Sequence, residues 1–404
     1  MLSFGALGCT ARLVEGGCAL EGQRNRDVVV ISLGFFLAFV GAGAAQPFVV
    51  GYLVDAKGLG EGQASLVLSG VYFSFVVFRF FIGFIIDVIG LHRAKIYGAA
   101  AYALFPLIVL KAEAYPVLLL ASVLWGLGAP MLWTGSLVQV MNVAGPGRHA
   151  TSAGIVRGTV TLALFVGAYM LSAIYERYGY ESLFVFAALS ALTAVIAMLA
   201  SPRREYPREK PELRTFLRLM GRRESRAVMA FLVAAGLAYG LLLNGFKTHI
   251  ELSCGVSWLK VILPFFSLAA VTSGFLGGRI SDRIGRWRTF MWGFALGGAG
   301  MILACGTIHP VGLAVALFLI GVEFAMVPLA AFGWIGDRTT PSDRASVMGY
   351  VFCFRDLGIA VAVQLRGAIH GPTTAFWLFG AASAVCAVAA FQIGRSSSGK
   401  GTAG

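Results

Sequence analysis

Charged residues are scarce in this chain. Only 13% of its 404 residues are Asp, Glu, Lys or Arg, whereas 58% are hydrophobic. Soluble globular domains carry about twice that share of charge, so the composition argues against a water-soluble fold. The apolar runs are about 20 residues or longer and show no ten-residue alternating pattern, which is typical of membrane-spanning helices and not of barrel strands. The sequence therefore predicts an all-α membrane protein.

Residues that build metal and nucleotide sites are also sparse. The six cysteines form no CxxC pair and no cluster with histidine, and the five histidines fall in loops or at expected helix ends. This spacing argues against a metal site and predicts free thiols. The chain has no glycine-rich phosphate loop followed by Lys, which disfavours an ATP-driven pump. We therefore expect neither a metal nor a cofactor.

The basic residues are numerous but unevenly placed. The formal net charge is +13, with 32 Lys and Arg against 19 Asp and Glu. We place 23 of the 32 basic residues in the tails and loops of one side, 6 on the other side and 3 inside apolar runs. This asymmetry follows the positive-inside rule and predicts a cell-membrane protein with both termini in the cytoplasm. The excess charge is then topological, and we expect no nucleic-acid partner.

One short motif occurs twice, 195 residues apart. Residues 83–95 read GFIIDVIGLHRAK and residues 278–288 read GRISDRIGRWR. The shared positions are Gly83 and Gly278, Asp87 and Asp282, Gly90 and Gly285, and Arg93 and Arg288. The same offset aligns further pairs, among them Gly41 with Gly236, Ala150 with Ala345 and Gly154 with Gly349. A register held over so much of the chain predicts two structurally equivalent halves.

These features together resemble the major facilitator superfamily of secondary transporters, over residues 28–394. The resemblance implies twelve transmembrane helices in two pseudo-symmetric six-helix bundles around a central cavity, and movement of a small solute by alternating access. It also implies that the motif residues gate the interface between bundles, together with Arg283 and Arg286 of the second copy. The first copy departs from the family pattern at Val88, where a basic residue is usual.

The apolar runs give the expected boundaries. We expect helices at 28–54, 64–86, 94–112, 115–141, 149–174, 181–200, 227–250, 257–280, 289–308, 311–335, 345–366 and 372–394. The chain then divides into a cytoplasmic tail (1–27), a first bundle (28–200), a basic cytoplasmic linker (201–226), a second bundle (227–394) and a cytoplasmic tail (395–404). In the linker, the spacing of Leu213, Phe216, Leu217 and Met220 predicts an amphipathic helix on the inner membrane face.

Five ionisable residues lie inside apolar runs, where each costs roughly 2.5 to 3.5 kcal/mol to insert and is a functional candidate for that reason. They are Arg79, Arg157, Glu323, Arg355 and Asp356. Arg79 and Asp356 lie at compatible depths in helices that pack together in the resembled family, which predicts an ion pair between the bundles. Arg157 has no acid on its own helix, so it either extends toward the cytoplasm or offers an anion site.

Glu323 is the candidate for proton coupling. It lies 14 residues before Asp337, roughly 21 Å along a helix and beyond the membrane midplane. Burial disfavours the charged form of a lone carboxyl group, which is the property that a proton carrier needs. Arg355 is its expected partner, so Glu323 either exchanges that partner for a proton or forms a permanent structural ion pair with it.

Polar and aromatic residues in other apolar runs complete the candidate substrate site. Gln46 precedes Pro47, which removes a backbone hydrogen bond and predicts a bend. Trp125, Ser136 and Gln139 fall along one stripe of the fourth run, which suits either a cavity or ordinary helix packing. The substrate and coupling candidates are Glu323, Arg355, Arg157, Gln46, Trp133, Gln139 and Asn244.

The sequence thus predicts a non-enzymatic, proton-coupled secondary transporter for a small molecule, working as a monomer in the lipid bilayer. The direction of transport stays open, and an anionic substrate is one interpretation of Arg157. A polytopic membrane enzyme is the alternative class, although such enzymes usually concentrate acidic or histidine ligands at one interface and this chain does not. A transporter-like receptor that does not transport is a further alternative.

Overall fold

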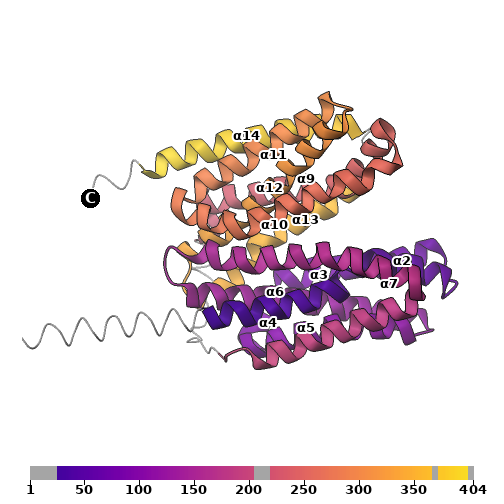
Figure 1. Ribbon diagram of the computed structural model, residues 1–404. Helices are drawn as coiled ribbons and strands as arrows, with labels where there is room; N and C mark the ends of the chain where they lie inside the picture. The colour runs from indigo at the N-terminus through magenta and orange to yellow at the C-terminus, as the bar shows by residue number, and fades with distance from the viewer. Residues whose placement is uncertain (1–24, 204–218, 366–371, 399–404) are drawn as a thin grey trace, which may run out of the picture.

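The structure is a computed structural model that describes residues 25–203, 219–365 and 372–398 (Figure 1). Within these ranges every regular element is a helix, and ten helical segments are long and apolar enough to cross a membrane. One of them, α7 (His149–Ala200), is two helices joined at a kink at Gly179, where φ is 78°. This kink and the 32-residue helix α9 (Arg223–Cys254) bring the described spans to the predicted twelve.

The helices form two groups, which lie one above the other in Figure 1. The first group contains the segment Asn25–Asp55, which includes the π-helix η1 (Phe39–Gly43) and α2 (Gln46–Asp55), then α3 (Glu61–Phe80), α4 (Ile82–Ile89), α5 (Leu91–Lys111), α6 (Tyr115–Ala144) and α7. The second group contains α9, the 3-10 helix η2 (Val256–Trp258), α10 (Leu259–Ile284), α11 (Arg286–Gly306), α12 (Pro310–Arg338), α13 (Arg344–Leu365) and α14 (Pro372–Ser398). These are the two six-helix bundles that the repeat predicts.

The first span is broken in the way that its sequence predicts. Pro47 has no backbone N–H, so the helix before it cannot continue with its normal hydrogen bonds. The chain instead forms the π-helix η1, in which the amide of Ala44 bonds to the carbonyl of Phe39 at 3.0 Å. Helix α2 then begins at Gln46. A second break, which the sequence did not predict, lies at Phe81 between α3 and α4.

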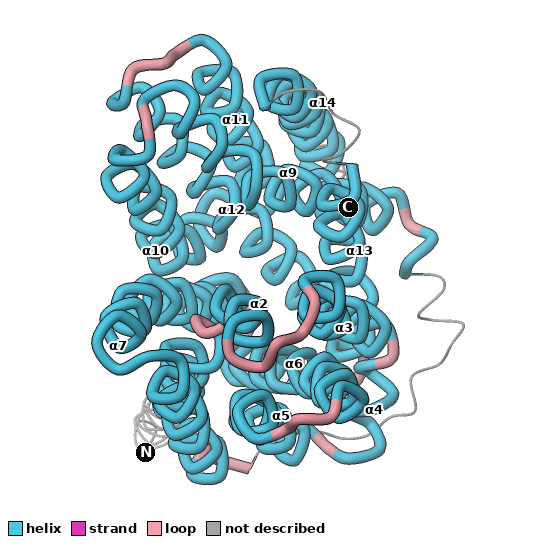
Figure 2. Tube along the Cα trace, turned by 90° about the vertical axis from the view of Figure 1, so that its right-hand side faces the viewer, coloured by secondary structure: helices cyan, strands magenta, loops and turns pink. Residues whose placement is uncertain are grey.

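The two bundles meet along two seams, which Figure 2 shows end-on: α7 lies against α10, and α3 with α4 lies against α13. Both seams are tightest at the end of the molecule that carries the turns at Gly90 and Gly285, which we call the basic end. A Cβ atom on Gly278 would lie 2.8 Å from Cα of Thr151, and one on Gly83 would lie 2.5 Å from Cα of Ser346. Small residues thus let backbone touch backbone at both seams. In Figure 1 the bundles diverge toward the opposite end.

The 195-residue offset of the sequence repeat also relates the two seams. Ser346 follows Thr151 by 195 residues, as Gly278 follows Gly83, so the two closest approaches are equivalent. Gly90 and Gly285 have φ of 87° and 93°, a region that glycine adopts without strain. Residues 213–218 of the predicted amphipathic segment 213–220 lie outside the described part of the chain, as do the first 24 residues.

Candidate functional site

Two arginines from opposite bundles occupy the centre of the molecule. Arg157 extends from α7 and Arg355 from α13, and both are largely buried. The guanidinium carbon of Arg157 lies 5.7 Å from the ring centre of Phe324, and that of Arg355 lies 5.6 Å from the same ring. Phe324, on α12, therefore links the two arginines. Stacking on an aromatic face stabilises a cation, and more so away from water.

Further rings complete this surface. Arg157 also lies 6.0 Å from the indole of Trp133 and 5.9 Å from Phe332, while Arg355 lies 5.8 Å from Tyr239. Tyr239 stacks on Phe324 at 4.5 Å between ring centres. The structure thus brings together the predicted residues Arg157, Arg355 and Trp133. The aromatic rings around them were missed in the sequence, because aromatic residues are frequent in every apolar run.

The charges around the two arginines do not balance. Asp356 forms the predicted ion pair with Arg79, with 2.7 Å between Oδ2 and Nη1, and its Oδ1 lies 3.7 Å from Nη1 of Arg355. In the described part of the chain, Arg157 has no side-chain hydrogen bond and no ion pair. Three arginines therefore share one carboxylate, which leaves a formal charge of +2 at the centre of the bundle interface.

The α7–α10 seam is closed by a polar network at the basic end. The carboxylate of Asp282 accepts hydrogen bonds from the backbone amides of Ala150 and Thr151 at 3.3 and 2.8 Å. These amides lie in the first turn of α7, where the helix dipole favours a negative charge. Arg286 donates to Asp282 at 2.5 Å and to Asp337 at 2.8 Å. The motif aspartate of one bundle thus caps a helix of the other.

Each seam has one further polar contact between the bundles, and the two contacts are equivalent. Beside the α7–α10 seam, Nδ1 of His149 on α7 lies 3.0 Å from Oδ1 of Asp337 on α12. Beside the other seam, Arg344 on α13 donates to Asn142 on α6. Arg344 follows His149 by 195 residues and Asp337 follows Asn142 by the same number, so these contacts are related by the repeat. Neither pair was singled out in the sequence, because the offset relates equivalent positions and does not show which residues are in contact.

The other motif residues lie either inside a helix before a turn or exposed near the turns. Asp87 lies in α4, three residues before the turn at Gly90. Three further basic residues that are predicted to gate the interface have exposed side chains near this end: Arg93, Arg283 and Arg288. Exposed charges of this kind are suited to holding a turn at the membrane surface.

Gln139 lies in a different place from the one predicted. It is fully buried inside the first bundle, where its amide donates to Asp27 at 2.8 Å and to the carbonyl of Pro202 at 3.1 Å, and its carbonyl accepts from Lys95. Lys95 also donates to Ser201 at 2.8 Å. The prediction that Gln139 lines the central cavity is wrong, because its stripe on α6 faces α5. This network instead fixes the start of the linker.

Glu323 does not meet its expected partner. Its Oε1 accepts a hydrogen bond from Ser383 on α14 at 3.4 Å, and its Oε2 is buried without a hydrogen-bond partner. A Cβ atom on Gly297 of α11 would collide with this carboxylate. Glu323 therefore points toward α11 and α14, whereas Arg355 pairs with Asp356. The predicted pairing of Glu323 with Arg355 is wrong.

The remaining candidates lie elsewhere. Gln46, at the start of α2, accepts a hydrogen bond from the hydroxyl of Tyr72 on α3 at 2.8 Å, which joins two helices of the first bundle. The side chain of Asn244 lies outside the part of the structure that is described.

Two helical bundles with glycine-packed seams and buried arginines between them define a membrane transporter of the alternating-access type. The family model for the Major Facilitator Superfamily matches residues 31–363, with a second match over 255–403. The chain belongs to this superfamily, whose members are generally transporters and not enzymes.

Relatives and solved structures agree with this assignment. An MFS-type transporter of Pseudomonas aeruginosa is 28% identical over 354 residues, covering 84% of this chain and 86% of the relative. The Escherichia coli K12 transporter YhhS is 26% identical over 364 residues, covering 87% and 88%. The human organic anion transporter MFSD10 superposes with a TM-score of 0.71 at 14% identity, covering 91% of this chain and 99% of that one. FucP, solved in its outward conformation, superposes with a TM-score of 0.73 at 13% identity, covering 91% and 98%.

Proposed function

We propose that this protein is a secondary active transporter that moves a small organic anion across the cell membrane. The observation that carries the proposal is Arg157, a largely buried cation that has no acidic partner among the described residues and lies against three aromatic rings. An unpaired charge inside a membrane protein is costly and is usually functional. A substrate carboxylate, sulfonate or phosphate would supply the missing partner through a two-pronged hydrogen bond to the guanidinium.

The rest of the site supports an anion with an apolar or aromatic body. The net charge of +2 at the bundle interface attracts anions and repels cations. Phe324, Phe332, Trp133 and Tyr239 offer flat apolar surface beside the charge, and ligand sites commonly combine such walls with a few placed polar groups. Because Arg157 and Arg355 come from opposite bundles, an anion between them would hold the bundles together and couple binding to their movement.

The seams support alternating access. The bundles are packed backbone against backbone at the basic end and diverge toward the other end (Figure 1). The positive-inside asymmetry supports a cytoplasmic position for the basic end and both termini, and in that orientation the seams are closed on the cytoplasmic side. Labelling of a single cysteine placed at 288 by an impermeant reagent from outside the cell would contradict this orientation.

The experiment that tests the proposal is transport into proteoliposomes. We expect saturable uptake of one or more aromatic or aliphatic organic anions, inhibited by other anions, and no uptake of lipophilic cations. Uptake should be measured with and without a pH gradient, because these two conditions separate coupled transport from facilitated diffusion. Saturable transport of cations alone would overturn the anion assignment, and anion binding without movement in any gradient would favour the receptor alternative.

Proton coupling is assigned to Glu323 on a separate argument. Glu323 is 3% exposed, and one of its carboxylate oxygens has no hydrogen-bond partner among the described residues, which also form no ion pair with it. It lies beside Phe324 in sequence, and Phe324 touches both arginines. A change of protonation at Glu323 would alter the packing of α12 against α11 and α14. Phe324, the next residue, would then shift against the two arginines of the substrate site.

Glu323→Gln is expected to remove proton-driven accumulation while exchange of labelled for unlabelled substrate continues. Glutamine has the same shape and can still accept the hydrogen bond from Ser383, so the fold should be kept. Glu251→Gln, a half-exposed position in the same bundle that pairs with Lys247 at 3.7 Å, is the matched control and should accumulate substrate normally. Full gradient-driven accumulation by the Glu323 variant would remove this residue from the coupling mechanism.

A further inference from the structure

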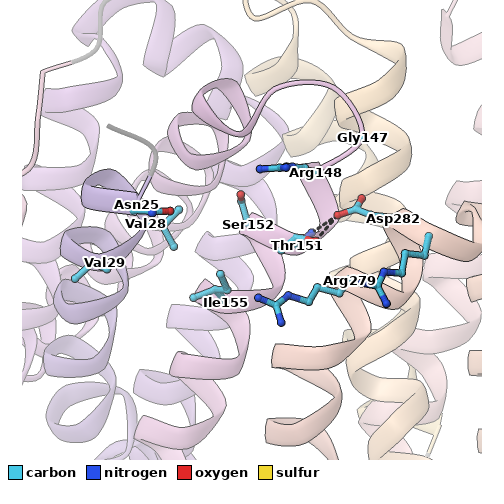
Figure 3. A pocket seen from close by; sticks show the side chains of 11 residues that line it. Asn25, Val28, Val29, Gly147, Arg148, Thr151, Ser152, Ile155, Arg279 and Asp282 are labelled. Atoms are coloured by element: carbon cyan, nitrogen blue, oxygen red, sulfur yellow. Dashed lines mark hydrogen bonds between the residues drawn. The ribbon is translucent and has the colours of Figure 1, made fainter. Parts of the chain in front are cut away.

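A cavity of about 640 Å³ lies at the basic end of the α7–α10 seam (Figure 3). Its walls come from both bundles: the start of the first span, the first turns of α7 and the last turns of α10. The lining residues are Asn25, Val28, Val29, Gly147, Arg148, Thr151, Ser152, Ile155, Arg279, Asp282 and Arg283. It is separate from the central arginines, which do not contribute to its walls.

The cavity has a surplus of free positive charge. Arg279 and Arg283 are one helical turn apart on α10, both are exposed, and neither has a hydrogen bond or an ion pair within the described ranges. Asp282 is the one acidic residue in the lining, and its oxygens already accept from Ala150, Thr151 and Arg286. Figure 3 shows the bonds from Thr151 to Asp282. The two arginines are therefore free to bind an anion from outside the protein.

The position of these arginines is at the border between lipid tails and headgroups. On α10, Leu276 and Ile280 are 57% and 41% exposed, as expected for side chains that face lipid. Arg279 lies between them, and α10 ends five residues later at Ile284, roughly 7.5 Å along the helix axis. Val29, on the opposite wall, is 64% exposed. The cavity thus joins an apolar, lipid-facing wall to two unpaired guanidinium groups at headgroup depth.

The opposite seam provides an internal comparison. Subtracting 195 places Arg279 and Arg283 on Phe84 and Val88, and adding 195 to Arg148 gives Asp343. Phe84 and Val88 are 72% and 61% exposed, so the equivalent surface is apolar and faces lipid. A basic residue is usual at the motif position of Val88 and Arg283, so Arg283 is the usual residue there. The motif does not explain the other two differences, Arg279 against Phe84 and Arg148 against Asp343.

We propose that this cavity binds the phosphate of an anionic phospholipid, with the headgroup on Arg279 and Arg283 and an acyl chain along Val29 and Ile155. The guanidinium groups would hold the phosphate oxygens through charge-assisted hydrogen bonds. Because its walls belong to both bundles, the bound lipid bridges the closed seam. It therefore stabilises the state in which the basic end is shut, and the lipid composition of the membrane sets the rate of opening.

The test uses the full-length protein in nanodiscs of phosphatidylcholine with or without phosphatidylglycerol. Native mass spectrometry of the released protein should show phosphatidylglycerol retained by the wild type. The double variant Arg279→Gln, Arg283→Gln should bind it roughly 30-fold more weakly, since each basic residue near an anionic surface contributes about 1 kcal/mol. Retention equal to that of the wild type would overturn the proposal.

The matched control removes two other exposed arginines from the same end of the molecule, Arg223 and Arg226 on α9. This control should retain phosphatidylglycerol like the wild type; equal loss in both double variants would show a diffuse surface attraction and no site. Inorganic phosphate at millimolar concentration distinguishes the two sources of the anion. If it displaces phosphatidylglycerol completely, the cavity is a site for soluble anions and the lipid assignment is wrong.

Discussion

Arg157→Gln is expected to lower anion transport roughly 100-fold and to leave the stability of the protein unchanged or slightly increased. The loss follows because a charge-assisted hydrogen bond to a buried substrate anion contributes roughly 2 to 3 kcal/mol. The small change in stability follows because no acidic side chain in the described ranges pairs with Arg157. The variant loses an unpaired buried charge, which is a gain, and the stacking on three rings, which offsets part of that gain. The measurement pairs initial uptake rates with thermal unfolding in detergent.

Two further variants make this result specific. Arg157→Lys keeps the charge and loses the planar guanidinium, so it should retain part of the transport with a raised KM. Arg177→Gln is the control: Arg177 lies on the same helix and stacks on Tyr178 at 5.6 Å, but it is exposed and far along α7 from the site. Loss of stability in the Arg157 variant together with normal uptake by the folded fraction would assign Arg157 a structural role and end the anion proposal.

The fold and the pairing of the bundles could be predicted because they depend on repeated, local properties. Run length and apolar composition give the spans, Pro47 gives the break in the first one, and the 195-residue register gives the equivalence of the two seams. The Arg79–Asp356 pair was also predictable, since two buried opposite charges at matching depths in neighbouring helices have few other partners.

The direction of a side chain within a bundle could not be predicted in the same way. Helical periodicity places Trp125, Ser136 and Gln139 on one stripe, but it does not say whether that stripe faces the central cavity or α5. The structure shows Trp125 against Tyr102 and Phe105 of α5, at 5.3 and 4.2 Å between ring centres, so the stripe faces α5 and not the central cavity.

The same limit explains two other outcomes. Lys95 was not among the five ionisable residues that the sequence placed inside the apolar runs, yet it is fully buried and bonds to Gln139 and Ser201. Glu323 was expected to pair with Arg355, but its neighbours come from α11 and α14, more than 20 residues away in sequence on one side and about 60 on the other. Contacts of that range depend on tertiary packing, which the pattern of one helix does not contain.

Removing either partner of the Arg79–Asp356 pair is expected to destabilise the protein by about 3 to 5 kcal/mol, the cost of leaving a buried charge without its partner. Both side chains are under 10% exposed, and Arg79 is held between the rings of Phe75 and Phe352 at 5.0 and 5.3 Å. The two losses should differ. After Arg79→Gln, Asp356 keeps Arg355 at 3.7 Å, whereas Asp356→Asn leaves both arginines without a carboxylate, so the second variant should be the less stable.

A double-mutant cycle separates this pair from two independent structural roles. Arg79→Gln combined with Asp356→Asn should cost less than the sum of the single losses, because the second change removes the charge that the first left unpaired. A charge swap should recover only part of the stability, since it places a second arginine beside Arg355. Additive losses in the cycle would show that the two residues are not partners.

The pair should also control the closure of the basic end, because it joins α3 to α13 across a seam. Cys353 reports on this directly: it lies in α13, and its thiol contacts the carbonyl of Val76 on α3 at 3.7 Å across the same seam. In a background with the other five cysteines replaced by alanine, a membrane-permeant thiol reagent should modify Cys353 faster in Asp356→Asn than in the protein with the intact Arg79–Asp356 pair. The difference in labelling rate should disappear when a saturating substrate anion, held by Arg157 and Arg355, draws the bundles together again. Equal labelling rates in both backgrounds would mean that the ion pair stabilises the fold without holding the seam shut.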